Sequence, residues 1–168
     1  MSVPLLLVDA TAGRLCRWLR LLGFDAAYHP GPGTGDVAEL FARARREGRR
    51  VVTRSSRVEA WAPEEVLRLG GDELEGQLAE VLAWLGEGAR ELVPFSRCSI
   101  CNLPVRPLGR EEAAGLVPPH VLGTRKVFGR CPCCGRVYWK ATHCEGIAGR
   151  LAPLARRAGG ALRLDPGA

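Results

Sequence analysis

The sequence contains no hydrophobic run long enough to cross a membrane. Its first apolar stretch, residues 4–8, follows no Lys or Arg and is stopped by Asp9. A helix that spans a bilayer needs about 20 apolar residues, and the apolar segment of a signal peptide needs about seven or more. We therefore expect a cytoplasmic protein that is neither secreted nor held at a membrane.

Acidic residues are scarce in the second half of the chain. Residues 97–168 contain 12 Lys and Arg against 4 Asp and Glu, whereas residues 1–96 contain 12 Arg against 14 acidic residues. The net charge of +6 therefore resides in the second half. A basic module beside a near-neutral domain favours a polyanionic partner, most simply nucleic acid. The alternative is that these arginines only solvate a thin, metal-dependent module.

Six of the seven cysteines fall between positions 98 and 144, and in a chain that we expect to have no secretion signal this favours metal binding over disulfide bonds. The seventh, Cys16, is expected in the core. Cys98 and Cys101 form one CxxC pair, and Cys131 and Cys134 form another. Asn or Gly follows each pair, and both residue types accept the left-handed conformation of a metal-binding turn. Four thiolates at this spacing predict one structural zinc ion with no position open to water. Cys133 is an alternative to Cys134, but the CxxC spacing favours Cys134.

Strand and helix patterns alternate over the first half of the chain. Short apolar runs predict strands, and apolar residues at helical spacing predict helices. The order β, α, β, α, β, β, α predicts an α/β fold in which helices sandwich a parallel sheet. The expected strands are 3–8, 26–28, 50–53 and 65–69, and the expected helices are 12–22, 36–48 and 72–85.

The length of 168 residues allows one ordinary domain and a small second module. We expect an α/β domain over residues 1–95 and a zinc ribbon over residues 96–149. Residues 150–168 are expected to form a short helix or a loose tail.

The ligand site of such a sheet lies beyond the carboxyl ends of its strands. Asp9 follows a buried strand there, where a carboxylate is costly unless a cation or a donor meets it. The stretch VVTRSSR (51–57) brings Arg54 and Ser55 to the end of another strand. Hydroxyls beside a guanidinium suit a phosphate, but without a carboxylate they cannot hold a catalytic metal.

Two further aspartates begin helices. Asp36 with Glu39, and Asp72 with Glu75, both fit an N-cap with a glutamate three residues later. For Asp72 the cap is the favoured interpretation. For Asp36 the cap and a metal-binding role remain equally open, because one carboxylate can serve both.

Arginines recur every three residues on the first helix, at Arg14, Arg17 and Arg20. A solvated helix face is the simpler interpretation for at least one of them. Arg14 lies in the first turn, about five residues from Asp9, where it can pair with that acid or meet a phosphate.

The segment after the second cysteine pair interleaves aromatic and basic residues. The aromatic residues of this segment are Tyr138 and Trp139, and its other members are Arg136, Lys140 and His143. Aromatic rings beside cations can stack on bases while the cations hold phosphates. The alternative is packing inside a small ribbon, which is favoured for Tyr138 and stays open for Trp139.

In combination, these motifs resemble the Mut-seven C-terminal type ribonuclease domain family, in which a PIN-like α/β nuclease domain is fused to a zinc ribbon. The resemblance covers residues 3 to about 145, and the order of its motifs is more specific than any one of them. The matching stretches are VDATAGRLCRWLRLLGFDA (8–26), DVAELFARA (36–44), RRVVTR (49–54), GDELEGQL (71–78), RCSICN (97–102), LVPPHV (116–121) and FGRCPCCGRVYWKATH (128–143).

The resemblance implies a PIN-like three-layer α/β/α fold and metal-dependent cleavage of RNA. Asp9 and Asp36 match the acids that would hold Mg²⁺ or Mn²⁺. The family pattern also expects an aspartate directly after Thr-Arg, where this chain has Ser55. Losing one carboxylate weakens hard-cation binding. Glu39 or Asp25 is an alternative source of that carboxylate, although the spacing does not show it. The alternative is therefore a catalytically weakened or silent RNA-binding protein.

The other candidate residues have expected roles if the site is active. Arg14 and Arg54 would steady phosphate oxygens, and Ser55 would contribute a hydroxyl or hold a water. The expected nucleic-acid contacts are Arg17, Arg130, Arg136, Trp139, Lys140 and His143.

Overall fold

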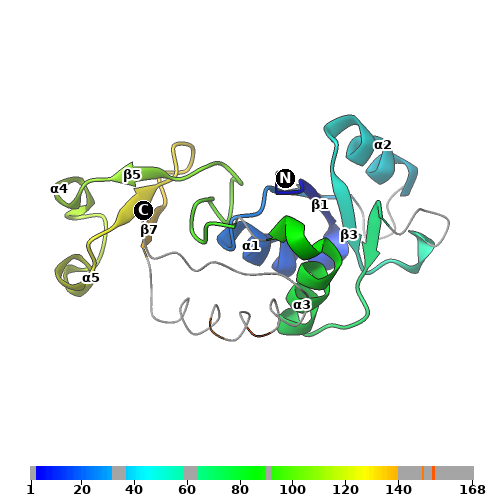
Figure 1. Ribbon diagram of the computed structural model, residues 1–168. Coiled ribbons are helices and arrows are strands. Elements are labelled where there is room, and N and C mark those ends of the chain that lie inside the picture. The colour runs from blue at the N-terminus through cyan, green and yellow to red at the C-terminus, as the bar shows by residue number, and fades with distance from the viewer. Residues whose placement is uncertain are drawn as a thin grey trace.

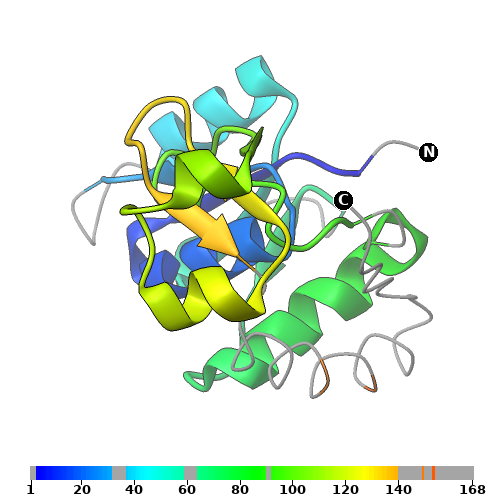
Figure 2. The ribbon, with the colours of Figure 1, turned by 90° about the vertical axis from the view of Figure 1, so that its left-hand side faces the viewer.

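The computed structural model describes residues 3–31, 37–58, 64–89 and 92–139, together with Gly149 and Pro153. Within them the chain forms an α/β part and, beside it, a smaller part with a three-stranded sheet (Figure 1). When the left-hand side of Figure 1 is turned to face the viewer, the smaller part lies in front of the α/β part (Figure 2). None of the described helices is long and apolar enough to span a membrane.

The α/β part is built on a parallel sheet of four strands. Its central strands are rich in Leu and Val, as expected for strands that are buried on both faces. The register pairs Asp9 with His29 and Thr53 with Arg68, so the carboxyl ends of the strands meet at one edge. In spatial order the strands are β2 (Ala26–His29), β1 (Leu6–Asp9), β3 (Arg50–Thr53) and β4 (Val66–Arg68).

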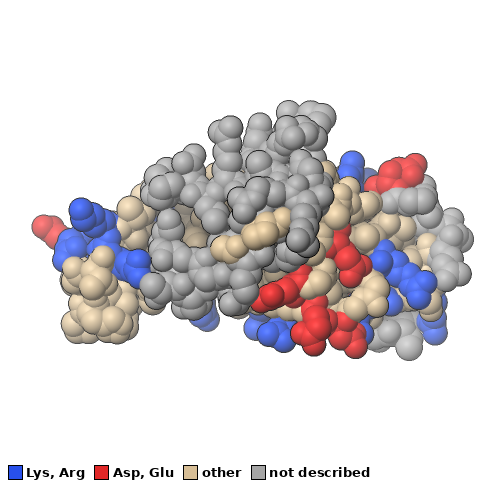
Figure 3. Space-filling view, turned by 60° about the horizontal axis from the view of Figure 1, so that its bottom comes forward, with Lys and Arg blue, Asp and Glu red and all other residues tan. Residues whose placement is uncertain are grey.

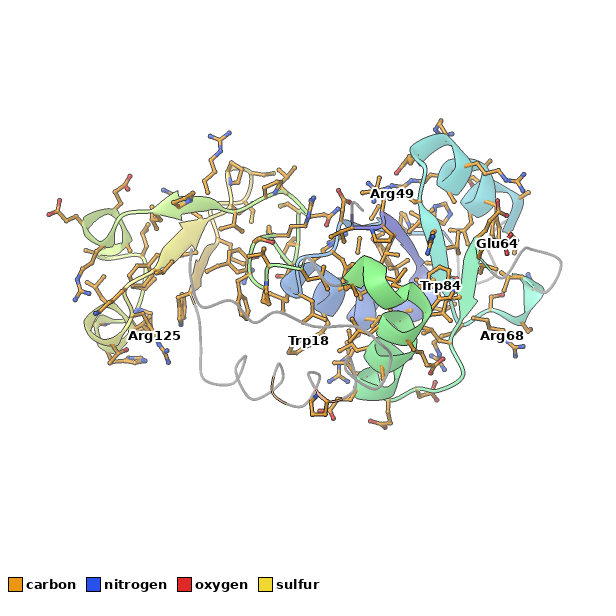
Figure 4. The ribbon with its side chains drawn as sticks, in the orientation of Figure 1. Trp18, Arg49, Glu64, Arg68, Trp84 and Arg125 are labelled. Carbon is orange, nitrogen blue, oxygen red and sulfur yellow. The ribbon has the colours of Figure 1, made fainter. Side chains whose placement is uncertain are left out.

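Helices cover both faces of this sheet and complete three layers. Along β1, Val8 joins the core under α1 and α3, while Leu7 joins the core under α2, because successive side chains of a strand alternate. Trp18 and Trp84, labelled in Figure 4, pack against the first of these cores. The helices are α1 (Gly13–Leu21), α2 (Val37–Glu47) and α3 (Leu74–Leu85), with short 3-10 helices at Ala10–Ala12, Ser56–Val58 and Gly86–Ala89.

Gly23 terminates the first helix. Its φ angle is 101°, which side-chain-bearing residues rarely adopt. A Cβ at this position would also lie 2.6 Å from the carbonyl oxygen of Val93. The chain therefore turns sharply here and begins β2 at Ala26.

The smaller part is an antiparallel sheet covered by two short helices. Its core consists of Ala113, Val117, Val121 and Phe128, and it shares no residue with the cores of the α/β part. The elements are β5 (Arg106–Leu108), α4 (Arg110–Ala113), α5 (Pro119–Thr124), β6 (Phe128–Arg130) and β7 (Val137–Trp139), with strand order β5-β6-β7.

Polar contacts join the two parts. The amide of Asn102 donates to Asp25 Oδ1 at 2.7 Å and its oxygen accepts from the backbone N–H of Ala26 at 3.2 Å. Arg97 forms an ion pair with Asp25 at 3.3 Å. The turn after the first cysteine pair is therefore fixed to the start of β2.

The layered α/β fold with a cysteine-containing ribbon agrees with the prediction. β3 coincides with the expected strand, and β1 begins at Leu6 instead of Val3. Most of the predicted tail, residues 150–168, lies outside the described residues, so its structure stays a prediction.

Candidate functional sites

The four predicted cysteines gather in one place. One ligand atom from each of Cys98, Cys101, Cys131 and Cys134 lies within 4.8 Å of the others, and the Sγ atoms of Cys98 and Cys134 are 3.7 Å apart. Cys133 is exposed and is not part of this group, in agreement with the CxxC spacing. Four soft sulfur donors from two turns suit a tetrahedral ion such as zinc, so the donor set fits the predicted metal.

Both turns have the backbone that the sequence predicted. Asn102 and Gly135 adopt φ angles of 62° and 70°. Their backbone N–H groups donate to the carbonyl oxygens of Cys98 at 2.9 Å and Cys131 at 3.0 Å. This closes each turn around its pair of sulfur atoms.

Polar groups around Cys98 favour its thiolate form. Burial alone would raise the pKa of Cys98, but hydrogen bonds from the Cys101 backbone and the Tyr138 hydroxyl lower it to about 6. The Tyr138 hydroxyl donates to Cys98 Sγ at 3.0 Å and accepts from the backbone N–H of Ser99 at 3.0 Å. Tyr138 therefore supports the first turn from the ribbon sheet, a role more specific than the packing that its sequence suggested.

Asp9 is held at the carboxyl edge of the parallel sheet by two threonines. Its Oδ1 accepts from the backbone N–H and the hydroxyl of Thr11, and its Oδ2 accepts from the hydroxyl of Thr53. Thr53 is fully buried. The donors expected for a carboxylate at this position are therefore two threonine hydroxyls and one backbone N–H.

The end of β3 is tied to the same cluster. The backbone N–H of Arg54 donates to Thr11 Oγ1 at 2.9 Å, and that of Ser55 donates to Thr53 Oγ1 at 3.0 Å. Each threonine hydroxyl thus accepts a hydrogen bond from the backbone just after β3 and donates one to Asp9. The Thr53 hydroxyl therefore connects the backbone of Ser55 to the carboxylate of Asp9.

Arg54 is already paired in the structure. Its guanidinium forms an ion pair with Asp72, and both side chains are exposed. The prediction that Asp72 caps the following helix is wrong: α3 begins at Leu74, its N-cap residue is Glu73, and no side chain caps it. The carboxylate of Asp72 instead pairs with the opposite charge of Arg54, which follows the end of β3.

The remaining predicted site residues are distributed differently. Arg14 is exposed on α1, and no ion pair joins it to Asp9 in the part of the chain that the structure describes. Asp36 lies outside the described residues, and Glu39 is exposed in the first turn of α2.

Asp25 lies at the opposite edge of the sheet. It precedes β2 and contacts Arg49 at 2.7 Å. Burial alone would raise the pKa of Asp25, but hydrogen bonds from Arg49 and Asn102 and the charges of Arg49 and Arg97 outweigh burial and lower the pKa. Arg49 and Arg68 mark these two opposite edges in Figure 4. Asp25 therefore cannot replace the missing acid.

Sequence reasoning missed two residues of the carboxyl edge. Thr11 stands two positions after Asp9, a spacing at which a hydroxyl can return to the carboxylate. His29 is the register partner of Asp9, and its Nδ1 is buried with no hydrogen-bond partner. The end of the expected strand 26–28 pointed to this position, but its place beside Asp9 required the strand order.

The Asp9 carboxylate retains one acceptor position that a hard cation could use. The three hydrogen bonds to Asp9 occupy three of the roughly four acceptor positions of a carboxylate, which leaves one on Oδ2. Magnesium sites in enzymes use as few as one or two carboxylates, with waters and substrate phosphates completing the shell. Asp9 therefore fits such an ion.

Several predicted nucleic-acid contacts lie on the ribbon. Arg136 is exposed, and so is Arg130, whose Nε donates to the carbonyl oxygen of Gly135 at 3.3 Å. Trp139 packs against the ribbon core, which favours its structural interpretation over stacking. Lys140 and His143 lie outside the described residues.

Charge is unevenly distributed over the face shown in Figure 3. Lys and Arg outnumber Asp and Glu at the ribbon end, whereas Asp and Glu gather over the region of α3, with further Lys and Arg beside them. The acidic residues at the start of α3 include Asp72, Glu73 and Glu75. A polyanion would therefore be attracted to the ribbon end of this face and repelled from the α3 region.

Comparison with protein families gives one result. A family model described as the Mut7-C RNAse domain matches residues 4–151. No curated protein and no solved structure matches the chain.

Proposed function

Since this chain belongs to the Mut7-C RNAse domain family, we propose that it is a metal-dependent ribonuclease of PIN-like type whose site surrounds Asp9. The observation that carries the proposal is the fixed carboxylate of Asp9 at the carboxyl edge of a parallel sheet, where α/β folds place their ligands. Thr11 and Thr53 orient it before any ligand arrives.

Asp9 and Asp36 are the residues that would hold Mg²⁺ or Mn²⁺. A divalent ion at such a site lowers the pKa of a bound water and neutralises charge that develops on a phosphate. Asp9 would supply an oxygen ligand to this ion. Thr11 and Thr53 keep its position by hydrogen bonds, so substrate entry requires no rearrangement of the acid.

The proposed role of Arg54 and Arg14 is to bind the phosphate of the substrate. The ion pair between Arg54 and Asp72 is exposed, and exposed ion pairs contribute about 0–1 kcal/mol. Arg54 can therefore exchange Asp72 for a phosphate at little cost. Arg14 is solvent-exposed in the first turn of α1, the end that follows Asp9. It can approach the phosphate without breaking a contact within the described residues.

The ribbon is proposed to bind RNA at a distance from the cleavage site. Residues 97–139 contain seven Lys and Arg against two Glu. Phosphate contacts dominate nucleic-acid affinity, and the exposed Arg130 and Arg136 are suited to make them. Lys140 and His143 are proposed to continue this surface.

A second candidate is a weakened or silent RNA-binding protein, and Ser55 favours it. The residue that follows Thr53 and Arg54 supplies a hydroxyl, which accepts from the backbone N–H of Arg57 at 3.3 Å, in place of a carboxylate. One negative charge is therefore missing from the proposed metal shell, which weakens the binding of a hard cation.

Incubation of the purified protein with mixed RNAs and Mn²⁺, with and without EDTA, distinguishes the two candidates. A ribonuclease shortens RNA with Mn²⁺ and stops when EDTA is added. A silent binder retards the same RNAs in native gels and leaves their length unchanged.

A further inference from the structure

Tyr28 exposes its aromatic ring on an edge strand of the sheet. It lies in β2 with 38% of its surface exposed, although Ala26 in the same strand is fully buried. The ring rests against the first residue of α1, because a Cβ on Gly13 would lie 3.4 Å from Tyr28 Cε2. Within the described residues, no hydrogen bond reaches its hydroxyl group. The ring is thus positioned by its contact with Gly13 and remains open to a ligand.

One stripe of α1 follows β2 from Tyr28 to the first cysteine pair. Gly13, Arg17 and Arg20 are four and three positions apart, so they share a helix face. At the far end, Arg20 is buried: its Nε donates to the carbonyl oxygen of Ala26 at 2.7 Å, and its Nη1 donates to that of Ile100 at 2.6 Å.

Arg17 occupies the middle of this stripe. It lies between the contact of Gly13 with Tyr28 and the contact of Arg20 with Ala26. Its side chain is exposed and makes no ion pair with the residues that the structure describes. The stripe therefore presents one uncompensated guanidinium near one exposed aromatic ring.

The same stripe begins beside the proposed cleavage site. A single 3-10 turn, Ala10–Ala12, joins Asp9 to Gly13. Tyr28 is the register partner of Val8, one residue before Asp9. With strands about 4.8 Å apart and a rise of about 3.3 Å per residue, the Cα atoms of Tyr28 and Asp9 are roughly 6 Å apart.

We propose that Tyr28 and Arg17 form a binding subsite for one nucleotide of single-stranded RNA, next to the phosphate that Arg14 and Arg54 are proposed to bind near Asp9. The base stacks on the Tyr28 ring, and Arg17 binds the adjoining phosphate. The subsite rests on the proposed function, since it takes RNA as the substrate. Every base has an aromatic face, so the subsite selects unpaired nucleotides and not a particular base. In a duplex those faces are covered by neighbouring bases and unavailable to a side chain.

Fluorescence anisotropy of a labelled oligouridylate tests the subsite on the full-length, zinc-loaded protein without added Mg²⁺ or Mn²⁺. An oligouridylate of about 12 nucleotides is within the span that single-strand-binding folds cover. Tyr28→Ala is expected to weaken binding on the order of 10-fold, because it removes one stacked base. Tyr28→Phe should retain the wild-type affinity, since the ring stays and the hydroxyl has no described partner.

Arg17→Ala should also weaken binding and lower the salt dependence by about 0.7 in the slope of log K against log [salt]. Arg46→Ala is the matched control, because Arg46 is an exposed arginine of α2, on the other face of the sheet. Arg46→Ala is expected to change the affinity and the salt slope less than Arg17→Ala does. A blunt duplex of similar length should be insensitive to Tyr28→Ala.

Three results would overturn the subsite while leaving the proposed function intact. These are equal binding of oligouridylate by wild type and Tyr28→Ala, equal weakening of single-stranded and duplex RNA, or a loss in Tyr28→Phe as large as in Tyr28→Ala. If Tyr28→Ala does not fold, an Arg17→Ala variant that matches Arg46→Ala overturns it. If the wild-type protein binds no RNA, the proposed function fails first and the subsite with it.

Discussion

The hydroxyl of Thr53 joins Asp9 to Ser55. It donates to Oδ2 of Asp9 at 2.5 Å and accepts from the backbone N–H of Ser55 at 3.0 Å. The two neighbouring strands β1 and β3 are thus linked at their carboxyl ends by one buried side chain. A side chain at position 55 therefore begins close to the only described carboxylate that we assign to the metal.

Restoring an acid at position 55 should strengthen the metal site. In Ser55→Asp, a second carboxylate near Asp9 should lower the melting temperature without metal through repulsion and raise the response to Mn²⁺ or Mg²⁺. A tenfold gain in affinity corresponds to about 1.4 kcal/mol of additional stability at excess metal. Thermal melts with and without Mn²⁺ measure this difference.

Ser56→Asp is the matched control, because it adds the same charge at the next, exposed residue. Its response to metal should resemble that of the wild-type protein. Equal responses in Ser55→Asp and wild type would mean that position 55 is outside the metal site or that another acid already fills its role.

The four-cysteine cluster should contain one zinc ion per chain. Elemental analysis of protein purified without chelator is expected to give a ratio near one, and Cys131→Ser should remove it, because a structural site needs its full set of ligands. Cys133→Ser, the same change on an exposed residue of the same loop, should retain the metal. Zinc-free wild-type protein, or equal zinc in both variants, would contradict the assignment.

Loss of zinc should also weaken the α/β part without unfolding it. The ribbon has a separate core, so α1 to α3 are expected to remain helical by circular dichroism. The first turn nevertheless accepts two hydrogen bonds from Arg20, at Ser99 and Ile100, and those contacts need an ordered turn. An unchanged melting temperature of the α/β part in Cys131→Ser would show that these contacts contribute nothing.

The contacts of Asp25 with Arg49 and Asn102 predict a pH dependence of stability. The pKa of Asp25 lies below its ordinary value of 3.8, so the unfolded state takes up its proton first as the pH falls. Asp25→Asn should therefore be less stable than wild type at neutral pH, and the difference should shrink as the pH falls below about 4. Melts from pH 7 to pH 3 test this, and a constant difference would exclude a contribution from the charge of Asp25.

Much of the fold followed from local patterns, and the exceptions are instructive. The strand at Arg50–Thr53 and the two cysteine turns were predicted from residue type and spacing. Both features are visible in a few consecutive residues, as an apolar run in the strand and as a CxxC pair followed by Asn or Gly in each turn. Asp72 was predicted as a cap, but its partner Arg54 is 18 residues away in sequence and belongs to another strand end. A capping pattern covers only neighbouring residues, so it cannot show that a distant arginine competes with the helix end for the aspartate.

Long-range polar contacts were beyond the reach of the sequence. Arg20 was read as one of three arginines on a helix face, yet it is buried against a turn 79 and 80 residues later. Helical spacing distinguished the faces of α1 but could not say which face meets the ribbon. For the same reason His29 was recognised at the carboxyl edge only from the strand order.

The cleavage of an unstructured RNA by Asp9→Asn, compared with wild type and Asp25→Asn in Mn²⁺, tests the central claim most directly. Asp25→Asn makes the same chemical change at the opposite edge of the sheet, and all three proteins are purified identically and assayed below their melting temperatures. We predict that wild type and Asp25→Asn cleave the RNA, that EDTA stops both, and that Asp9→Asn retains less than about one hundredth of the rate, a loss of about 2.7 kcal/mol in transition-state stabilisation. Cleavage by Asp9→Asn at the wild-type rate would contradict a metal-dependent site at Asp9.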